Sequence, residues 1–483
     1  MRERTPAAPP RRHTPVFRVF SPAGLPLAAN PASRRLPLSG GRPPFSSAPA
    51  SGAVPAAGAG IPCAAQRRRI SRMSNAILVV GGGFSGLTAA LEAAELGHDV
   101  YLVEKSPWLG GRVAQLSKYF PKLCPPSCGL EIQFQRIRKN PRITCLTLAE
   151  VVGLSGRKGD YTARVRLSPR HTAPHNVDFS LLAQSLDGEA PSEFDFGLGS
   201  RKALYKPMPF AYPARWALDP DTLTRADAAR VAGNRFLQVD EAPREIELSV
   251  GAIVVATGWK PYDMRNLANL GGGDIRNCIS NMQMERLASA FGPTGGRIVR
   301  PSDGRTPLSV GFVQCAGSRD QNHLGYCSYI CCMATFKQCL YLAEQHPQTR
   351  VTVFYIDLRA PGRYVKVLEK VQALPNVTFI KGKVAEAVQI ENDRVRLTAE
   401  DAIRGEKLSL DFDLAVLATG MQPALAAEDL PLPLPLDEDG FVAGGEEAGI
   451  FACGCARMPL DVTRSAQSGT AAALKAVQTV KGR

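Results

Sequence analysis

Four of the twelve cysteines in this 483-residue chain lie within eighteen residues of one another. Cys315, Cys327, Cys331 and Cys332 follow the pattern C-x11-C-x3-C-C, which runs from the end of an apolar strand into a helix. We expect Cys327 and Cys331 to share one helical face. Four converging thiolates are the donor set of a [4Fe-4S] cluster, whereas a zinc site more often shows two separated C-x2-C pairs. The spacing therefore favours a cluster over zinc, or over four cysteines that pack as small apolar side chains.

A second pair of cysteines, Cys124 and Cys128, has two prolines in the loop between them. The pair could form a redox disulfide that faces a flavin, supply ligands to a cluster shared with a partner, or remain two reduced structural thiols. Because the cysteines are unevenly spaced in a long chain, redox or metal chemistry fits them better than a framework of structural disulfides.

A nucleotide-binding pattern occupies residues 75–104. An apolar strand, a glycine turn, a small-residue helix and a second strand predict a βαβ unit. In this interpretation Gly81 permits the tight turn, Gly83 leaves room for a pyrophosphate, and Gly86 lets the helix pack closely on the strand. The helix amino terminus faces the phosphates. Glu104, at the end of the second strand, would accept hydrogen bonds from a ribose diol.

Further segments favour FAD over NAD as the dinucleotide. LGGR at 109–112 follows the βαβ unit, and two apolar strands end in ATG, at 252–258 and 414–420. The segment GIFACGCA at 449–456 resembles the strand in which two-domain flavoproteins place Gly-Asp against the ribityl chain, with Cys455 in the place of the Asp. The predicted cofactor-binding residues are Gly81, Gly83, Phe84, Ser85, Gly86, Glu104, Lys105, Gly111, Arg112, Thr257, Gly258, Gly420, Gly454 and Cys455.

A second strand-helix-strand-helix unit is expected over residues 308–374, but QCAGSRD stands where a nicotinamide-binding GxGxxG would be. We therefore expect an α/β fold with two Rossmann-like βαβ domains of the thioredoxin reductase or pyridine nucleotide-disulfide oxidoreductase type. The expected boundaries are 1–72 for a disordered extension, 73–300 for the first part of the FAD-binding domain with an insert at about 150–250, 301–405 for the second Rossmann-like domain, and 406–483 for the second part of the FAD-binding domain.

Charge and composition separate the first 72 residues from the rest. They hold twelve arginines and one acid, and so carry most of the formal net charge of +14. Because they are proline-rich and lack Tyr and Trp, we expect disorder, either as an over-extended start before Met73 or as an organelle transit peptide. The remainder has mixed charges and no basic stripe, which argues against nucleic acid as a partner. Prolines break the uncharged stretch at 43–66 and glycines break the one at 73–91, which argues against a membrane span.

The motifs YFPKLCPPSCGLE, FVQCAGSRDQNHLGYCSYICCMATFKQ and FYIDLRAPG, together with the glycine-rich segment, resemble the A subunit of heterodisulfide reductase. They resemble more closely the A subunit of the quinone-interacting membrane-bound oxidoreductase of sulfur metabolism. The resemblance spans residues 73–483, and the CxGSRD…CSxxCC segment is its most specific part.

This resemblance implies a FAD-dependent oxidoreductase that holds FAD and a [4Fe-4S] cluster, with the four cysteines at 315–332 as its ligands. It implies that Lys337 lies beside the flavin ring, where a cation would stabilise the reduced flavin; the alternative is a solvated helix lysine. Many A subunits of heterodisulfide reductases carry ferredoxin-like cysteines after the first βαβ unit, but this chain has none between Cys145 and Cys278, so it should hold fewer clusters.

The implied setting is a cytoplasmic complex with iron-sulfur/flavin and haem-bearing subunits, which contacts the inner face of the membrane only through those partners. Such a complex would link the membrane quinone pool to adenylylsulfate reductase in sulfur metabolism. The alternative enzyme is a pyridine nucleotide-disulfide oxidoreductase that uses Cys124 and Cys128 as its dithiol, and the missing second glycine motif counts against it.

Overall fold

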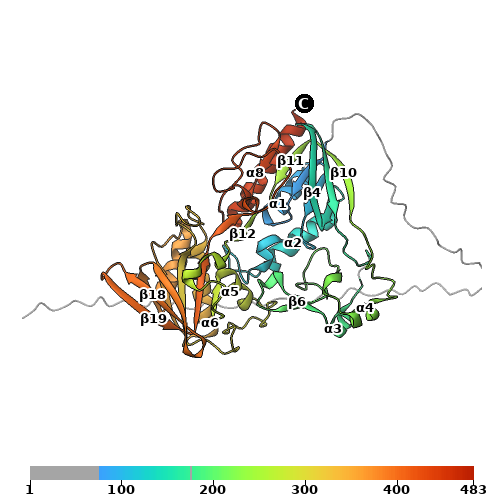
Figure 1. The fold of residues 1–483 in the computed structure, drawn as a ribbon. Coiled ribbons are helices and arrows are strands. Elements are labelled where there is room, and N and C mark those ends of the chain that lie inside the picture. Colours follow the sequence, from blue (N-terminus) through green and yellow to red (C-terminus); the bar gives the residue numbers. More distant parts are fainter. Residues whose placement is uncertain (1–74, 175–176, 483) are drawn as a thin grey trace, which may run out of the picture. The chain divides into compact units, whose positions relative to one another are not determined.

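The computed structural model describes residues 75–174 and 177–482, which build two parallel sheets flanked by helices and smaller antiparallel sheets (Figure 1). The predicted disordered extension 1–72 lies outside the described residues. Each sheet contains strand-helix-strand units, which confirms the predicted α/β fold with two Rossmann-like units.

The first sheet has the strand order β22-β11-β1-β2-β3, and all neighbouring strands are parallel. Its strands are β1 (Ile77–Val80), β2 (Val100–Glu104), β3 (Ile143–Thr147), β11 (Ala252–Val255) and β22 (Ile450–Ala452). All four residues of β1 are buried, as expected for an apolar strand inside a parallel sheet. α1 (Phe84–Glu95) connects β1 to β2, and α2 (Pro126–Lys139) precedes β3.

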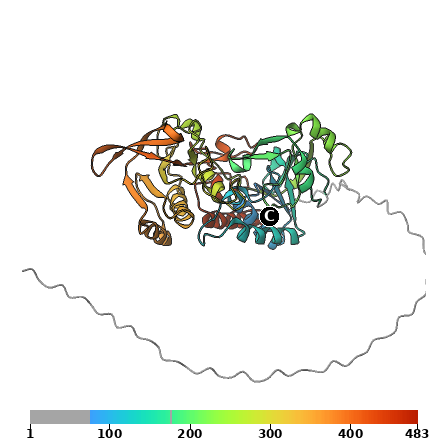
Figure 2. The ribbon, with the colours of Figure 1, turned by 90° about the horizontal axis from the view of Figure 1, so that it is seen from below.

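A segment more than 300 residues after β1 completes this first sheet. β22 pairs with β11, and α8 (Val462–Lys481) packs against α1, as both views show (Figure 1 and Figure 2). The close approach depends on Gly469, where a Cβ atom would lie 2.4 Å from the main-chain oxygen of Ser85. Three buried alanines, at 472, 473 and 476, continue the same narrow face of α8.

The second sheet has the strand order β13-β20-β14-β15-β16 and is also parallel. Its strands are β13 (Cys278–Ser280), β14 (Ser309–Ala316), β15 (Arg350–Tyr355), β16 (Val377–Lys381) and β20 (Leu414–Thr419). The associated helices are α5 (Asn281–Ala288), α6 (Cys331–Gln345) and α7 (Val365–Gln372). The antiparallel strands β17 (Val384–Ile390), β18 (Arg394–Asp401) and β19 (Glu406–Phe412) cover the opposite face, where Gly311 makes room for Leu397 and Phe412.

The segment to which the sequence assigned no function consists of two parts. The antiparallel sheet β10-β5-β4 pairs β4 (Ala149–Arg157), β5 (Asp160–Leu167) and β10 (Arg244–Val250). Between β5 and β10 lie α3 (Ser180–Ser185), α4 (Arg225–Val231) and the short strands β6 (Glu189–Pro191), β7 (Ser200–Lys202), β8 (Leu204–Tyr205) and β9 (Ala217–Leu218). A further two-stranded antiparallel sheet pairs β12 (Trp259–Pro261) with β21 (Met421–Pro423), the residues that follow the two ATG segments.

Two predicted elements are wrong in detail. The helix before His346 begins only at Cys331, so Cys327 precedes it and does not share a helical face with Cys331. The strand predicted through residue 456 ends at Ala452, because Gly454 has a left-handed φ of 60° and starts a short 3-10 turn. In the part of the chain that the structure describes, every helix is too short or too polar to cross a bilayer.

Candidate functional site

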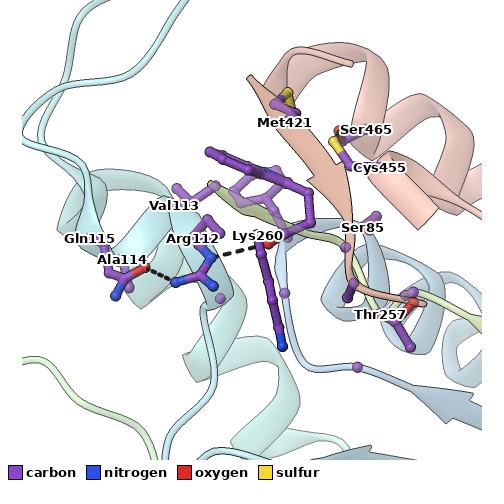
Figure 3. Close-up of a pocket in the computed structure, with 18 of the residues that line it drawn as sticks. Ser85, Arg112, Val113, Ala114, Gln115, Thr257, Lys260, Met421, Cys455 and Ser465 are labelled. Carbon is purple, nitrogen blue, oxygen red and sulfur yellow. Dashed lines mark hydrogen bonds between the residues drawn. The ribbon is translucent and has the colours of Figure 1, made fainter. Parts of the chain in front are cut away.

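A cavity of about 880 Å³ opens at the carboxyl ends of the first sheet's strands and extends toward α5 and α6. Ligands of parallel α/β sheets bind at this edge. Figure 3 shows residues from the 3-10 helix Gly111–Gln115, from the ATG segment at 256–258 and from the start of α8 around it. The volume is suited to a large ligand such as a dinucleotide.

The glycine turn after β1 has the shape that a pyrophosphate requires. A Cβ atom on Gly83 would meet no heavy atom closer than 3.9 Å, so this position opens into the cavity. Gly81 has a φ of 109°, and a Cβ on Gly86 would lie 1.9 Å from the Gly81 oxygen. Gly86 therefore packs the helix on the turn and does not line the cavity, whereas Gly83 leaves the amino terminus of α1 open to an anion.

Glu104 stands on the cavity wall at the end of β2. Its Oε2 accepts the Gly82 N–H at 2.6 Å and its Oε1 accepts the Ser106 N–H at 2.7 Å. Burial raises the pKa of Glu104, although these two N–H groups lower it in part. Each carboxylate oxygen keeps a second lone pair, so the fixed side chain can still accept a ribose hydroxyl.

Three cations line the cavity near one carboxylate, Glu428. Lys105 lies 3.5 Å from Glu428, Lys260 forms a shorter ion pair with the same side chain, and both lysines line the cavity. Arg112 donates from Nε to the Trp259 oxygen at 3.1 Å and from Nη1 to Gln115 Oε1 at 2.9 Å, as Figure 3 shows. Lys105, Lys260 and Arg112 give a phosphate-bearing ligand positive groups to contact on this wall.

Cys455 lies close to the start of α8, next to Ser465 (Figure 3). Its Sγ is 3.5 Å from the Leu460 oxygen and 3.9 Å from Ser465 Oγ. Burial raises the pKa of Cys455 to about 11, so the thiol is neutral at physiological pH. This part of the wall therefore offers a thiol and a hydroxyl, with the carboxylate of Asp461 also on the lining.

Lys337 lies on the cavity wall and not in solvent, with 4% of its surface exposed. Its Nζ donates to the Lys118 oxygen at 2.6 Å and forms an ion pair with Glu285 at 3.1 Å. The alternative of a solvated helix lysine is thereby wrong, because α6 turns this face toward the cavity. Whether the ammonium group contacts a flavin remains a prediction.

Most predicted cofactor residues meet at this one cavity. It is lined by Gly81, Gly83, Phe84, Ser85, Glu104, Lys105, Gly111, Arg112, Thr257, Gly258 and Cys455. Three predicted glycines are absent from the lining, Gly86, Gly420 and Gly454. A Cβ on Gly454 would lie 2.5 Å from Ser85 Oγ, and one on Gly420 would lie 2.3 Å from Ser318 Oγ. These two glycines allow close packing behind the wall, and Gly420 does so against the cysteine-bearing loop.

The four clustered cysteines lie at the carboxyl ends of the second sheet's strands. Cys315, near the end of β14, has a φ of 55°, Cys331 Sγ is 3.8 Å from the Thr419 oxygen at the end of β20, and Cys332 Sγ is 3.7 Å from the Asp357 oxygen after β15. Burial raises the pKa of Cys331, and the thiolates of Cys315, Cys332 and Cys327 raise it further. Cys315, Cys331 and Cys332 therefore lie at one edge of the second sheet, and Cys327 lies on the loop that leads into α6.

The donor set fits an iron-sulfur cluster in kind and number. Among residues 75–174 and 177–482, no three His, Cys, Asp or Glu side chains are arranged to hold a single metal ion. A four-iron cluster needs a wider arrangement, because each cysteine binds a different iron.

Two arginines lie next to this donor set. Burial raises the pKa of Cys315, and Arg319 lowers it in part. Asp357 raises the pKa of Arg359, and the thiolate of Cys327 raises it further. Both arginines also form ion pairs with Asp357, whose main-chain oxygen lies 3.7 Å from Cys332 Sγ.

Cys124 and Cys128 lie at the start of α2, apart from the four clustered cysteines, and neither lines the cavity. Cys128 is exposed and Cys124 is half-buried. Burial raises the pKa of Tyr119, and the two thiolates raise it further, so both cysteines are near this ring. Tyr119 itself lines the cavity and separates the pair from it.

Several wall residues were missed by the motif analysis. Glu285, Tyr329, Tyr364, Glu428 and Ser465 were not among the predicted site residues, yet all five line the cavity. These residues reach the cavity only because the second sheet and α8 pack against the first sheet, and the local sequence does not reveal that packing. The one available signal was the adjacent pair of charged residues, Glu285 and Arg286, within the short and otherwise uncharged helix α5.

Comparison with known proteins shows which sequences this chain is similar to. A family model described as FAD dependent oxidoreductase matches residues 76–126. An iron-sulfur A subunit of the CoB--CoM heterodisulfide reductase of Methanopyrus kandleri is 36% identical over 415 residues, which cover 83% of this chain and 63% of that protein. The A subunit of the ferredoxin/F(420)H(2)-dependent CoB-CoM heterodisulfide reductase of Methanosarcina acetivorans is 35% identical over 425 residues, which cover 84% of this chain and 53% of that protein. The chain is a homologue of the heterodisulfide reductase A subunits.

This heterodisulfide reductase A homologue spans little more than half to just under two thirds of the length of those relatives. Among solved structures, T. acidophilum thioredoxin reductase matches with a TM-score of 0.47 and 12% identity, over 85% of this chain and 99% of that one. The family model over residues 76–126 and these homologues support a FAD-dependent oxidoreductase. The open glycine turn and the fixed carboxylate of Glu104 fit FAD as the occupant of the cavity.

Proposed function

We propose that the chain is an electron-transfer subunit that binds FAD in the cavity and a [4Fe-4S] cluster at Cys315, Cys327, Cys331 and Cys332. One observation carries the proposal: the segment 327–333 contributes residues both to the cavity wall and to the cysteine group. Tyr329, Ile330 and Met333 line the cavity, and Cys327, Cys331 and Cys332 are interspersed with them along the chain. A cluster at these thiols would therefore lie directly behind the wall.

In this role FAD would exchange electrons in pairs with one partner and singly with the cluster. The chain's own contribution is to hold both sites rigidly. Glu104 and the glycine turn fix the adenosine end, and Lys337 presents a cation at the other end of the cavity. At the cysteine group, Arg319 and Arg359 supply positive charge, and burial excludes water.

The finer proposal is that the protein works in a complex that links the membrane quinone pool to adenylylsulfate reductase. It would be cytoplasmic and reach the membrane only through a haem-bearing partner. The support is the sequence resemblance to the quinone-interacting oxidoreductase and the absence of cysteines between Cys145 and Cys278. Reduction of the bound flavin by a quinol in the assembled complex, and its reoxidation by adenylylsulfate reductase, would test it.

The cluster is tested by replacing one proposed ligand and one matched cysteine on the same helix. Cys332→Ala should lose the iron and its EPR signal after anaerobic purification, with FAD retained. Cys339→Ala is the control, because Cys339 is fully buried on α6 and lies outside the four-cysteine group. Wild-type protein that binds FAD but never iron would contradict the cluster.

A further inference from the structure

Tyr329 occupies the boundary between the cavity and the cysteine group. Its main-chain N–H donates to Cys327 Sγ at 3.4 Å, and the residue lines the cavity. Tyr329 therefore contacts the proposed cluster ligand Cys327 through its main chain and also forms part of the cavity wall.

The backbone at Tyr329 is held in a conformation that bulky residues rarely adopt, with a φ of 66°. Its neighbours enforce this conformation. Ser328 Oγ lies 2.7 Å from Ser318 Oγ and accepts the Met421 N–H at 2.9 Å. Outliers that the surrounding structure maintains in this way concentrate at functional sites.

The Tyr329 hydroxyl is buried and has no hydrogen-bond partner among the residues that the structure describes. The Arg464 guanidinium carbon lies 5.1 Å from the ring centroid and contacts the ring instead. A buried hydroxyl without a partner is costly, so most such groups in proteins are satisfied. A ligand that fills the cavity can supply the missing acceptor after a small movement of the ring.

The position of Tyr329 indicates which half of FAD it would meet. Gly83 and Glu104 define the pyrophosphate and adenosine end of the cavity. Tyr329 belongs to the segment that leads into α6, which carries Lys337, and comes from the second sheet's side of the cavity. If the adenosine half of FAD lies at the Gly83 and Glu104 end, the flavin half lies at the end of the cavity that Tyr329 lines.

We propose that the Tyr329 hydroxyl donates a hydrogen bond to the flavin half of bound FAD while its main-chain N–H holds Cys327. Tyr329 then fixes the flavin relative to the cluster and is a cofactor-binding residue. The role toward FAD rests on the family assignment, and the role toward the cluster rests on the proposed function.

The test compares Tyr329→Phe with Tyr326→Phe in the full chain. Tyr326 is the matched control, since it lies three residues away, has a hydrogen-bonded hydroxyl and does not line the cavity. FAD is titrated into apoprotein, and flavin fluorescence and absorption are recorded. Tyr329→Phe should weaken FAD binding about three- to tenfold and shift the flavin absorption bands. Tyr326→Phe should leave both unchanged.

Two further readouts separate cofactor binding from a structural role. The melting temperature of the apoprotein should not fall in Tyr329→Phe, because the removed hydroxyl has no protein partner among the described residues. Unchanged FAD affinity and spectrum, or a lowered apoprotein melting temperature, would overturn the inference. Wild-type protein without iron would instead refute the cluster and leave the FAD contact of Tyr329 to be decided by the titration.

Discussion

Lys337 and Glu285 form an ion pair on the wall of the 880 Å³ cavity, with 3.1 Å between Nζ and Oε2, and both side chains are almost fully buried. Glu285 also accepts hydrogen bonds from the Ser117 N–H, the Gln338 amide and the Tyr341 hydroxyl. The pair therefore ties α5 and α6 of the second sheet to the loop that precedes Tyr119. A single carboxylate organises this end of the cavity.

We predict that Glu285→Gln destabilises the chain by about 3 kcal/mol, because it leaves the Lys337 ammonium buried without its counter-charge. Urea unfolding with FAD bound measures the change. Glu446→Gln is the control, since Glu446 pairs with Lys475 on the surface, where such pairs contribute less than about 1 kcal/mol. Equal effects of the two substitutions would show that the buried pair has no special importance.

Gly83→Ala and Gly86→Ala should fail in different ways. The new Cβ of Gly83→Ala points into open space, so the chain should fold with an unchanged melting temperature but bind FAD at least about tenfold more weakly. The Cβ of Gly86→Ala would lie 1.9 Å from the Gly81 oxygen, so folding itself should suffer. Thermal unfolding of apoprotein and FAD titration distinguish the two; FAD binding unaffected by Gly83→Ala would argue against a pyrophosphate at this turn.

Replacing Cys124 and Cys128 together by serine tests the alternative dithiol function. If electrons leave through the 315–332 cysteines, the double variant should keep wild-type flavin reduction and iron content, and NADH or NADPH alone should reduce neither protein rapidly. Stopped-flow absorbance at the flavin band measures the rates. Fast reduction by a nicotinamide cofactor that is coupled to this pair would favour the disulfide oxidoreductase instead.

Asp227 gives the fold a pH dependence that can be measured. Burial alone would raise its pKa, but N–H groups of Asp187, Gly188 and Thr224 hold the pKa of this carboxyl well below its usual range. Because the folded-state pKa is lowered, the stabilisation is complete above the unfolded value of about 3.9 and is lost as the pH falls below it.

Asp227→Asn should therefore cost about 2 kcal/mol at pH 7 and less at pH 3. Urea unfolding at the two pH values provides the comparison. Asp221→Asn, which changes an exposed residue of the same region, should have little effect at either pH. A loss for Asp227→Asn that is the same at both pH values would contradict the assignment.

The sequence predicted those parts of the site that depend on local backbone geometry. One βαβ unit, which is continuous in the sequence, positions the turn at Gly81 and Gly83 and the strand-end Glu104. The local sequence pattern was therefore sufficient to predict all three positions. The same holds for both parallel sheets, whose apolar strands are recognisable one at a time.

Features that depend on contacts between distant segments were not predictable in this way. Helix α6 begins only at Cys331, after a loop in which Ser328 bonds to Ser318 and Met421, and no periodicity in the local sequence reveals those partners. The packing role of Gly420 was also unpredictable from the local sequence. Its ATG motif is the same as that of Gly258, but the absent side chain makes room for Ser318 of the cysteine-bearing loop.

The position of β22 and α8 makes completion of the cavity depend on the last part of the chain to be synthesised. Residues 450–481 are translated after the rest of the cavity wall, yet they complete the sheet that begins at Ile77, and Cys455 and Ser465 close one side of the cavity. A nascent chain still lacking α8 has an unfinished binding wall. The cavity wall is therefore complete only once α8 has left the ribosome.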